Sequence, residues 1–278
     1  MGIKLDTLFP APSRSCRRTG PVLYALLALI SMSASTATAQ SDQTLQRLDA
    51  IAGAGVNENR AVGLVAAVVR GEDTLLMNAY GNANVEWDIP MTTDAMFEVG
   101  SIAKQFTAAA ILKLRDAGRL SLDDPITKWL PDLGESGDTV TLRRMLSHTS
   151  GINHFSEARD WEMNYFTPGI PRDSLYHLIE IEPFQFPPGQ VQAYNSSAFW
   201  LLGLVVEKAS GMRYEDYVRT MFFEPLGMTR SMYCDSSANV PRRAHGYAMQ
   251  NGMIRRALSR FSSTWTKRLR QEGRLLSA

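Results

Sequence analysis

Apolar and polar residues follow one another along the chain in patterns that predict both helices and strands. Residues 44–55 have the periodicity of an amphipathic helix. Residues 62–84 contain two apolar runs around polar residues 70–73, which is typical of a β-hairpin. Further helices are predicted within residues 102–117, 121–133, 141–152, 193–212 and 214–228. The pattern contains no internal repeat and no low-complexity segment.

The segment "VGSIAKQFTAAAILKL" at residues 99–114 is unusual, because a lysine lies near the start of an otherwise almost wholly apolar stretch. A helix that is apolar nearly all round is normally buried in a larger core. Ser101 is a favoured capping residue at the predicted helix start, and Gly118 is a typical stop. We therefore expect Lys104 to have little access to open water, and a buried lysine needs a partner.

Ser101 is the predicted partner of Lys104. Side chains three residues apart lie on the same face of a helix, roughly 5–6 Å from each other. Burial disfavours the charged form of the amine, and a serine beside a positioned base is an activated nucleophile. The pattern is short, and a capping serine with a snorkelling lysine is the alternative interpretation.

Composition and charge narrow the classes of function. Of the 278 residues, 45% are hydrophobic and 21% are charged, as in an ordinary soluble globular protein. The net charge of +1 gives no reason to expect a nucleic-acid partner. No spacing of histidine and cysteine residues indicates a metal site, and we expect no cofactor.

The first 39 residues are predicted to be a secretory signal peptide. Four basic residues precede the short apolar run "VLYALLALISM", and "ATA" supplies small residues before Gln40. The run is too short to span a bilayer comfortably, and an uncleaved amino-terminal anchor is the alternative. We expect cleavage before Gln40 and a periplasmic or secreted protein without a stable membrane span. Cleavage would remove Cys16 and leave Cys234 without an intrachain disulfide partner.

Several polar residues have both an ordinary and a functional interpretation. His148, in "LSHTSGI", is a candidate general base, but a histidine near a helix C-terminus more often caps free carbonyls. Asp123 and Asp124 form an acid pair, although turn or cap residues before a proline are the more ordinary interpretation. Ser196 or Ser197 is expected to cap the long apolar helix.

Residues 251–278 differ in character from the rest of the chain. They contain seven lysine or arginine residues and one acid, Glu272. A basic amphipathic helix, a loop, and sequence read out of frame are the alternatives for this tail.

Seven short motifs follow one another between about residues 45 and 248: "GSIAKQFTA", "GRLSLDDPI", "LSHTSGI", "PPGQ", "YNSSAFWLLG", "EKASGM" and "EPLGM". Together they resemble the serine β-lactamase and penicillin-binding-protein superfamily, in the branch of class C β-lactamases, D-alanyl-D-alanine carboxypeptidases, D-aminopeptidases and β-lactamase-like esterases. Each motif is weak alone, but seven in the usual order leave little room for chance. The resemblance implies an α+β fold, an α/β sandwich in which helices flank an antiparallel sheet beside a mostly helical subdomain.

The resemblance also implies roles for individual residues. Ser101 would be the nucleophile and Lys104 the amine that helps to deprotonate it. Tyr194 matches the tyrosine of the family's Y-x-N motif, which acts as general base toward the serine and then as proton donor to the leaving group. A core tyrosine with a satisfied hydroxyl is the alternative for Tyr194. Ser196 stands where the family has asparagine, so Ser196 and the adjacent Asn195 are the candidate substrate-binding residues.

A second departure from the family pattern lies downstream of Tyr194. No K-T-G or H-x-G motif follows, and "HGY" at residues 245–247 comes too early and matches a different family segment. The closing "GRLLSA" is similar to the family's "GGLLST" stretch, which precedes its last strands. We therefore expect a signal peptide at 1–39, an incomplete β-lactamase-like domain at 40–250 without its C-terminal strands, and a truncated or divergent tail at 251–278.

The function implied by this resemblance is that of an exported serine hydrolase. It would act through an acyl-serine intermediate on a small-molecule or peptide substrate: a β-lactam, a D-Ala peptide or a small ester. The alternative is a crippled remnant or a penicillin-recognising binding module of the same fold.

Overall fold

The computed structural model describes residues 42–134, 137, 139–154, 179, 184–234, 239–250, 253–256 and 274–277. The expected signal peptide with its cleavage site before Gln40 lies outside the described residues. No helix in the described ranges is long and apolar enough to cross a membrane.

The predicted amino-terminal helix and hairpin are both present. A helix covers residues 42–57, and strands β1 (Gly63–Arg70) and β2 (Asp73–Asn84) pair antiparallel around the turn that the sequence indicated. The short strand β3 (Ile89–Pro90) extends this sheet on the β2 side. Asp49 of the helix accepts a hydrogen bond from the Tyr80 hydroxyl of β2, which ties the helix to the hairpin.

A second small sheet joins segments that are far apart in the sequence. Strand β8 (Arg274–Ser277) lies between β4 (Phe97–Glu98) and β5 (Met232–Cys234) and is antiparallel to both. Strands β6 (Tyr247–Gln250) and β7 (Met253–Arg256) form a separate hairpin. The strands in the described residues thus form three small sheets rather than the one expected sheet.

The expected domain boundary at residue 250 does not match these strands. The β6–β7 hairpin crosses it, with Gln250 paired to Met253, and β8 inserts between two strands of the preceding domain. These parts of the basic tail therefore pair with strands of the preceding residues or with each other. Residues 257–273 of the tail lie outside the described ranges.

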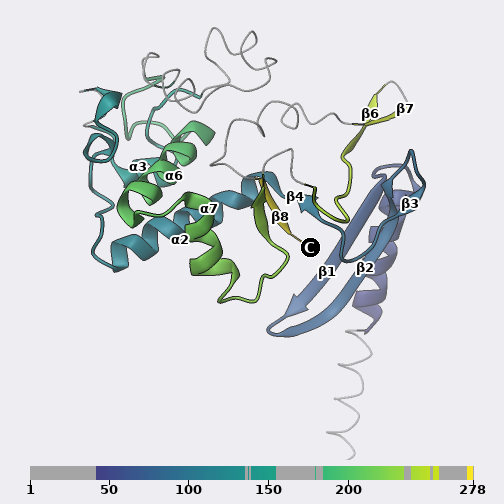
Figure 1. Cartoon of the computed structure of the whole chain (residues 1–278). Coiled ribbons are helices and arrows are strands. Elements are labelled where there is room, and N and C mark those ends of the chain that lie inside the picture. The colour runs from purple at the N-terminus through teal and green to yellow at the C-terminus, as the bar shows by residue number, and fades with distance from the viewer. Residues whose placement is uncertain are drawn as a thin grey trace, which may run out of the picture.

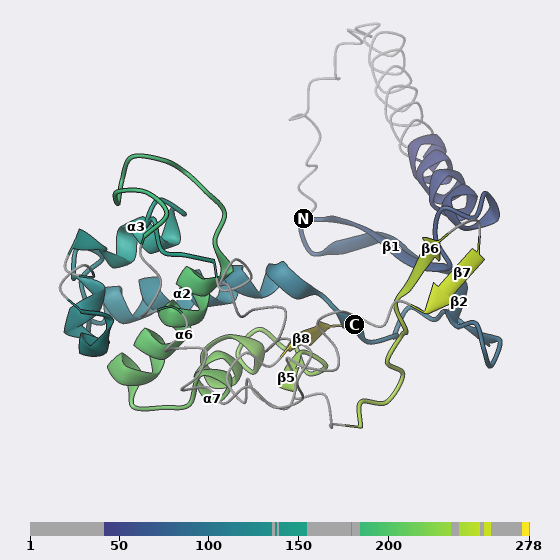
Figure 2. The same cartoon turned by 90° about the horizontal axis from the view of Figure 1, so that it is seen from above.

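Helices form most of the remaining structure. They are η1 (Gly100–Ile102), α2 (Ala103–Asp116), η2 (Ile126–Lys128), η3 (Pro131–Leu133), α3 (Leu142–Leu146), α6 (Ser196–Ser210), α7 (Tyr214–Val218) and the π-helical turn η6 (Arg219–Phe223). Figure 1 shows helices α2, α3, α6 and α7 gathered on one side of the molecule, and the β1–β2 hairpin with the amino-terminal helix on the other, with β4 and β8 between them. The view from above in Figure 2 shows the same separation. The α+β class is therefore confirmed.

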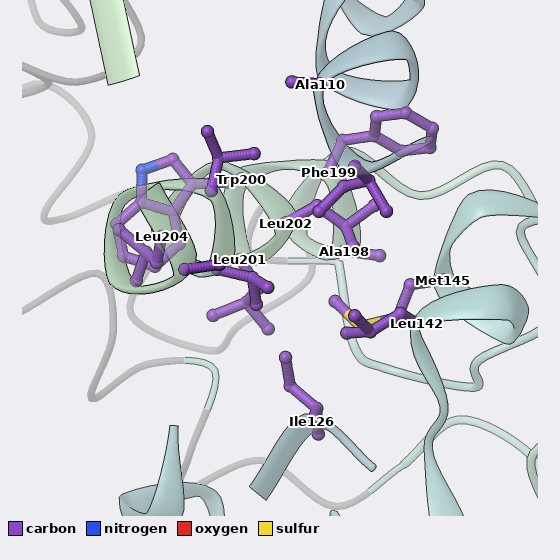
Figure 3. Close-up of a cluster of buried hydrophobic side chains, with 14 of the residues drawn as sticks. Ala110, Ile126, Leu142, Met145, Ala198, Phe199, Trp200, Leu201, Leu202 and Leu204 are labelled. Carbon is purple, nitrogen blue, oxygen red and sulfur yellow. The ribbon is translucent and has the colours of Figure 1, made fainter. Parts of the chain in front are cut away.

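The hydrophobic core lies in the helical part and is centred on α6. Trp200, Leu201 and Leu202 of α6 are almost completely buried, and Figure 3 shows them with residues of α2 and α3. Ala110 of α2 and Met145 of α3 belong to the same cluster. Burying a large apolar side chain stabilises a fold by roughly 1.5–3 kcal/mol. This packing fixes α2 against α6 and so fixes the relative positions of the segments that precede them.

The acid pair near residue 123 has the ordinary structural role. Asp124 accepts a hydrogen bond of 3.0 Å from the backbone N–H of Ser121 and forms an ion pair with Lys128. Asp123 pairs with Arg143. Both carboxylates therefore organise the turn before α3, as the ordinary interpretation predicted.

Candidate active site

Ser101 lies in a tight turn between strand β4 and helix α2. Gly100 has a φ of +53°, in the left-handed region that glycine adopts without steric cost, and the chain then enters the 3₁₀ turn η1. The N-cap of α2 is Ile102, without a side-chain cap, so Ser101 is not the capping residue that the sequence suggested. The exposed Ser101 hydroxyl instead contacts two other side chains.

Lys104 lies one turn after the serine, as its spacing predicted. Its Nζ donates to Ser101 Oγ over 3.4 Å, a long hydrogen bond. The same ammonium lies 5.0 Å from the ring centre of Tyr194 and 5.7 Å from that of Phe199. Such cation–π contacts favour a cation on the ring face. Lys104 therefore points into the site rather than along the surface to water.

Tyr194 is brought to the serine by the start of helix α6. Its hydroxyl is 2.6 Å from Ser101 Oγ, and its side chain is more than half exposed. Burial raises the pKa of the Tyr194 phenol, but hydrogen bonds with Lys104 and Ser101 and the charge of Lys104 outweigh it. The net pKa lies below the usual value for tyrosine, near 10. Ser101, Lys104 and Tyr194 thus form one cluster.

Asn195 and Ser196, the two candidate substrate-binding residues, have different environments. Asn195 is buried and is the N-cap of α6: its Oδ1 accepts from the Ala198 N–H at 2.8 Å, and its Nδ2 donates to the Ile152 carbonyl. Each end of this amide thus has a hydrogen-bond partner within the protein, and the substrate-binding role of Asn195 stays a prediction. Asn195 also takes the capping role expected of Ser196 or Ser197.

Ser196 remains at the site. It is the first residue of α6 and is partly buried. Its side chain hydrogen-bonds to the phenol of Tyr194, which helps to lower the pKa of that tyrosine. The sequence predicted that Ser196 lies beside the candidate catalytic residues, but it did not indicate the contact between Ser196 and Tyr194.

His148 has neither of the two roles considered for it. Its ring Nδ1 accepts from the Asn195 backbone N–H at 3.2 Å and does not cap the carbonyls of α3. Its ring centre lies 4.8 Å from that of Tyr194 and 4.9 Å from that of Phe199. Among the described residues, the ring of His148 contacts Asn195, Tyr194 and Phe199 rather than Ser101. In the sequence, His148 stands in a turn before a glycine. Local periodicity does not show which distant segment the ring of such a histidine will contact.

The cluster offers the chemistry of a serine nucleophile with a nearby acid–base pair. The phenolate form of Tyr194, in direct contact with the serine hydroxyl, can accept its proton, and the adjacent ammonium stabilises this phenolate before the transfer. In the ranges that the structure describes, no group of three or more histidine, cysteine or carboxylate side chains could hold a metal ion.

Known proteins are similar to this chain in sequence. The Beta-lactamase family model matches residues 43–273. Esterase EstB of Burkholderia gladioli is 34% identical over 195 residues, which are 66% of this chain and 50% of EstB. A penicillin-binding protein of Bacillus subtilis (strain 168) is 31% identical over 183 residues, 64% of this chain and 40% of that protein. The chain thus spans about half the length of these curated relatives.

A solved structure supports the fold. The octameric penicillin-binding protein homologue from Pyrococcus abyssi has a TM-score of 0.70 and 29% identity, with 84% of this chain and 53% of that chain covered. The family match crosses residue 250 and includes the nucleophile turn, α2, α6 and the β6–β7 hairpin. This protein therefore belongs to the β-lactamase family of serine hydrolases and penicillin-binding proteins.

Proposed function

We propose that the protein is an exported serine hydrolase that acts through an acyl-serine intermediate on an ester or amide bond of a small molecule or peptide. The observation that carries this proposal is the 2.6 Å contact between Ser101 Oγ and the Tyr194 hydroxyl, with Lys104 beside both. A nucleophile within hydrogen-bond reach of an oriented base is the arrangement that acyl transfer needs.

Each of the three residues has a defined part in the proposed reaction. Ser101 Oγ attacks the carbonyl carbon while its proton passes to the Tyr194 oxygen. Tyr194 then delivers this proton to the leaving group as the bond to the carbonyl carbon breaks. A water molecule attacks the acyl-serine in the second half, with Tyr194 again taking a proton and returning it to Ser101. Lys104 keeps the phenolate stable in both halves, and the Ser101 backbone N–H supplies one donor to the oxyanion.

Ser196 bears on the choice between ester and amide substrates. A serine has one hydroxyl, whereas an asparagine offers both a carbonyl and an amide donor and reaches further. The Ser196 side chain is already engaged with Tyr194. We therefore favour a small ester over a substrate that must be held through an amide group, such as a β-lactam or a D-Ala peptide.

Substitution of Ser196 tests this preference. We expect Ser196→Asn to raise the ratio of kcat/KM for nitrocefin to kcat/KM for p-nitrophenyl butyrate by about tenfold, the equivalent of one additional net hydrogen bond. Ser196→Ala is the matched control, because it removes the same hydroxyl and adds no amide; it should leave the ratio unchanged. An equal ratio in Ser196→Asn and Ser196→Ala would contradict the preference.

A binding module that is acylated but turns over slowly is the second candidate. It is favoured by the absence of a K-T-G or H-x-G motif between Tyr194 and residue 278 of the sequence. Steady turnover of p-nitrophenyl butyrate would support the hydrolase, whereas a single stoichiometric burst of product would support the binding module.

Export to the periplasm or the medium is part of the proposal and rests on the sequence of residues 1–39. The basic stretch, the apolar run and the small residues at 37–39 support it. We expect the mature protein to begin at or near Gln40. Amino-terminal sequencing of the secreted or periplasmic form tests this, and a sequence that reads from Met1 would contradict cleavage.

A further inference from the structure

Tyr194 is an exposed member of the cluster formed by Ser101, Lys104 and Tyr194. More than half of the side chain is accessible to solvent. Its hydroxyl contacts are with Ser101, Lys104 and Ser196, the groups with which it would exchange protons or charge. The position of the phenol must therefore be set mainly by what holds the backbone and the ring.

His148 holds both. The backbone N–H of Ala193, the residue before Tyr194, donates to the His148 carbonyl at 2.9 Å. The backbone N–H of Asn195, the residue after it, donates to His148 Nδ1 at 3.2 Å. The two hydrogen bonds bracket Tyr194, and the His148 ring lies against the tyrosine ring between them, with Phe199 as a further neighbour.

The backbone of His148 is itself in a costly conformation. Its φ is +58°, in the left-handed region that residues other than glycine seldom adopt. The helix α3 ends just before it, and Gly151 with a φ of +72° follows. A glycine at 148 would form this turn at lower cost, but it would supply no ring. Backbone strain is typically found at functional sites. The strained conformation of His148 beside the Ser101, Lys104 and Tyr194 cluster therefore indicates that its side chain has a function.

We propose that His148 is a positioning residue that clamps Tyr194 in register with Ser101 and Lys104, and that it does so only as the neutral imidazole. This inference rests on the proposed function of Tyr194. The neutral form follows from the hydrogen bond: Nδ1 accepts from the Asn195 N–H, so the ring proton must lie on Nε2. Protonation of His148 Nδ1 would place its N–H against the N–H of Asn195. Two donors cannot hydrogen-bond to each other, so this contact of the clamp would be lost.

The surroundings of His148 favour its neutral form. Burial lowers the pKa of His148, and the positive charge of Lys104 lowers it further. The titratable groups facing it are Lys104 from α2 and the Tyr194 phenol from the segment before α6, while Phe199 of α6 is apolar. The clamp is therefore intact at neutral pH and is lost as the pH falls through the lowered pKa of His148.

Three substitutions of His148 separate the effect of its imidazole ring from the effect of its left-handed backbone conformation. His148→Gly relieves the strain and removes the ring, whereas His148→Ala removes the ring and keeps the strain. His148→Asn tolerates the left-handed conformation, and its side-chain oxygen can accept from the Asn195 N–H in place of Nδ1. The assay is the rate at which a fluorophosphonate probe acylates Ser101, together with thermal unfolding of each variant.

We expect His148→Gly to slow acylation by about tenfold to a hundredfold, the usual cost of a small misplacement of a reacting group. His148→Asn should recover most of this loss. The proposal would be overturned if His148→Gly were acylated at the rate of the wild type. It would also be overturned if His148→Asn showed no recovery while both variants unfold cooperatively. In wild type, the fall in acylation that follows from protonation of Tyr194 should become steeper below the pKa of His148. This additional fall should be absent from His148→Asn, and acid limbs of identical shape in both proteins would refute the requirement for a neutral ring.

A second readout does not depend on activity. The Tyr194 phenol is titrated by ultraviolet difference absorbance, with the Tyr194→Phe protein subtracted to remove the other eight of the nine tyrosines. Its pKa should rise in His148→Gly, because the phenol leaves Lys104 and Ser101, and should return toward the wild-type value in His148→Asn. An unchanged pKa in His148→Gly would count against the clamp. Failure of the wild type to be acylated at Ser101 would instead count against the proposed function.

Discussion

Replacing Ser101 with alanine should abolish covalent labelling of the protein by a fluorophosphonate or a fluorescent penicillin. The serine oxygen is the atom that forms the acyl bond in the proposed reaction, and no neighbouring hydroxyl has the same contacts with Tyr194 and Lys104. The measurement is in-gel fluorescence after labelling, with the modified peptide identified by mass spectrometry. Loss of the signal should be complete rather than partial, because an alanine cannot be acylated.

A serine outside the cluster provides the control for this experiment. Ser121 is exposed, and its hydroxyl accepts from the Asp123 N–H in a turn that takes no part in the site. Ser121→Ala should label like the wild type. Labelling that persists in Ser101→Ala would refute the assignment of the nucleophile.

Replacing Tyr194 with phenylalanine should lower the rate of acylation by about 10²–10⁴, the usual contribution of a general acid–base group. The substitution keeps the ring, and with it the packing against His148 and Lys104, but removes the oxygen that receives the serine proton. Because the pKa of Tyr194 is below its usual value, the wild-type rate should rise with pH as the phenol ionises. This rise should disappear in Tyr194→Phe.

Tyr247 is a suitable control for the loss of a phenolic hydroxyl. Its hydroxyl contacts Glu86 and the Val85 N–H at the β6–β7 hairpin rather than the catalytic cluster. Tyr247→Phe should acylate within about threefold of the wild type, as expected for a site outside the reacting groups. A rate for Tyr194→Phe within the same narrow range would show that another group takes the proton.

The sequence predicted best those parts of the fold that depend on local spacing. The hairpin around residues 70–73 and the apolar helix α6 follow from periodicity, and both are present. Ser101 and Lys104 lie on the same side of a helical turn because they are three residues apart. Tyr194 could be placed ahead of α6 from the same local pattern, but its contact with Ser101 was implied only by the family resemblance.

Other features depend on contacts between distant segments and could not be derived from local pattern. A strand of four residues such as β8 is too short to show a periodicity, and the tail that contains it left a basic helix, a loop and sequence read out of frame as alternatives. The choice of Asn195 over Ser196 as the cap is set by the Ile152 carbonyl, which lies in another segment. The role of His148 likewise depends on the loop that carries Tyr194 being folded against it.

The pairing of β4 with β8 has a consequence for the order in which the protein can mature. Phe97 pairs with Ser277, so the strand that leads into the Ser101 turn is completed by residues made long after it. Contacts between such distant residues form slowly, because a long loop must close first. A nascent chain that has already produced Ser101, Lys104 and Tyr194 therefore still has an unsupported nucleophile turn. Acylating power should therefore arise late, after synthesis has reached β8.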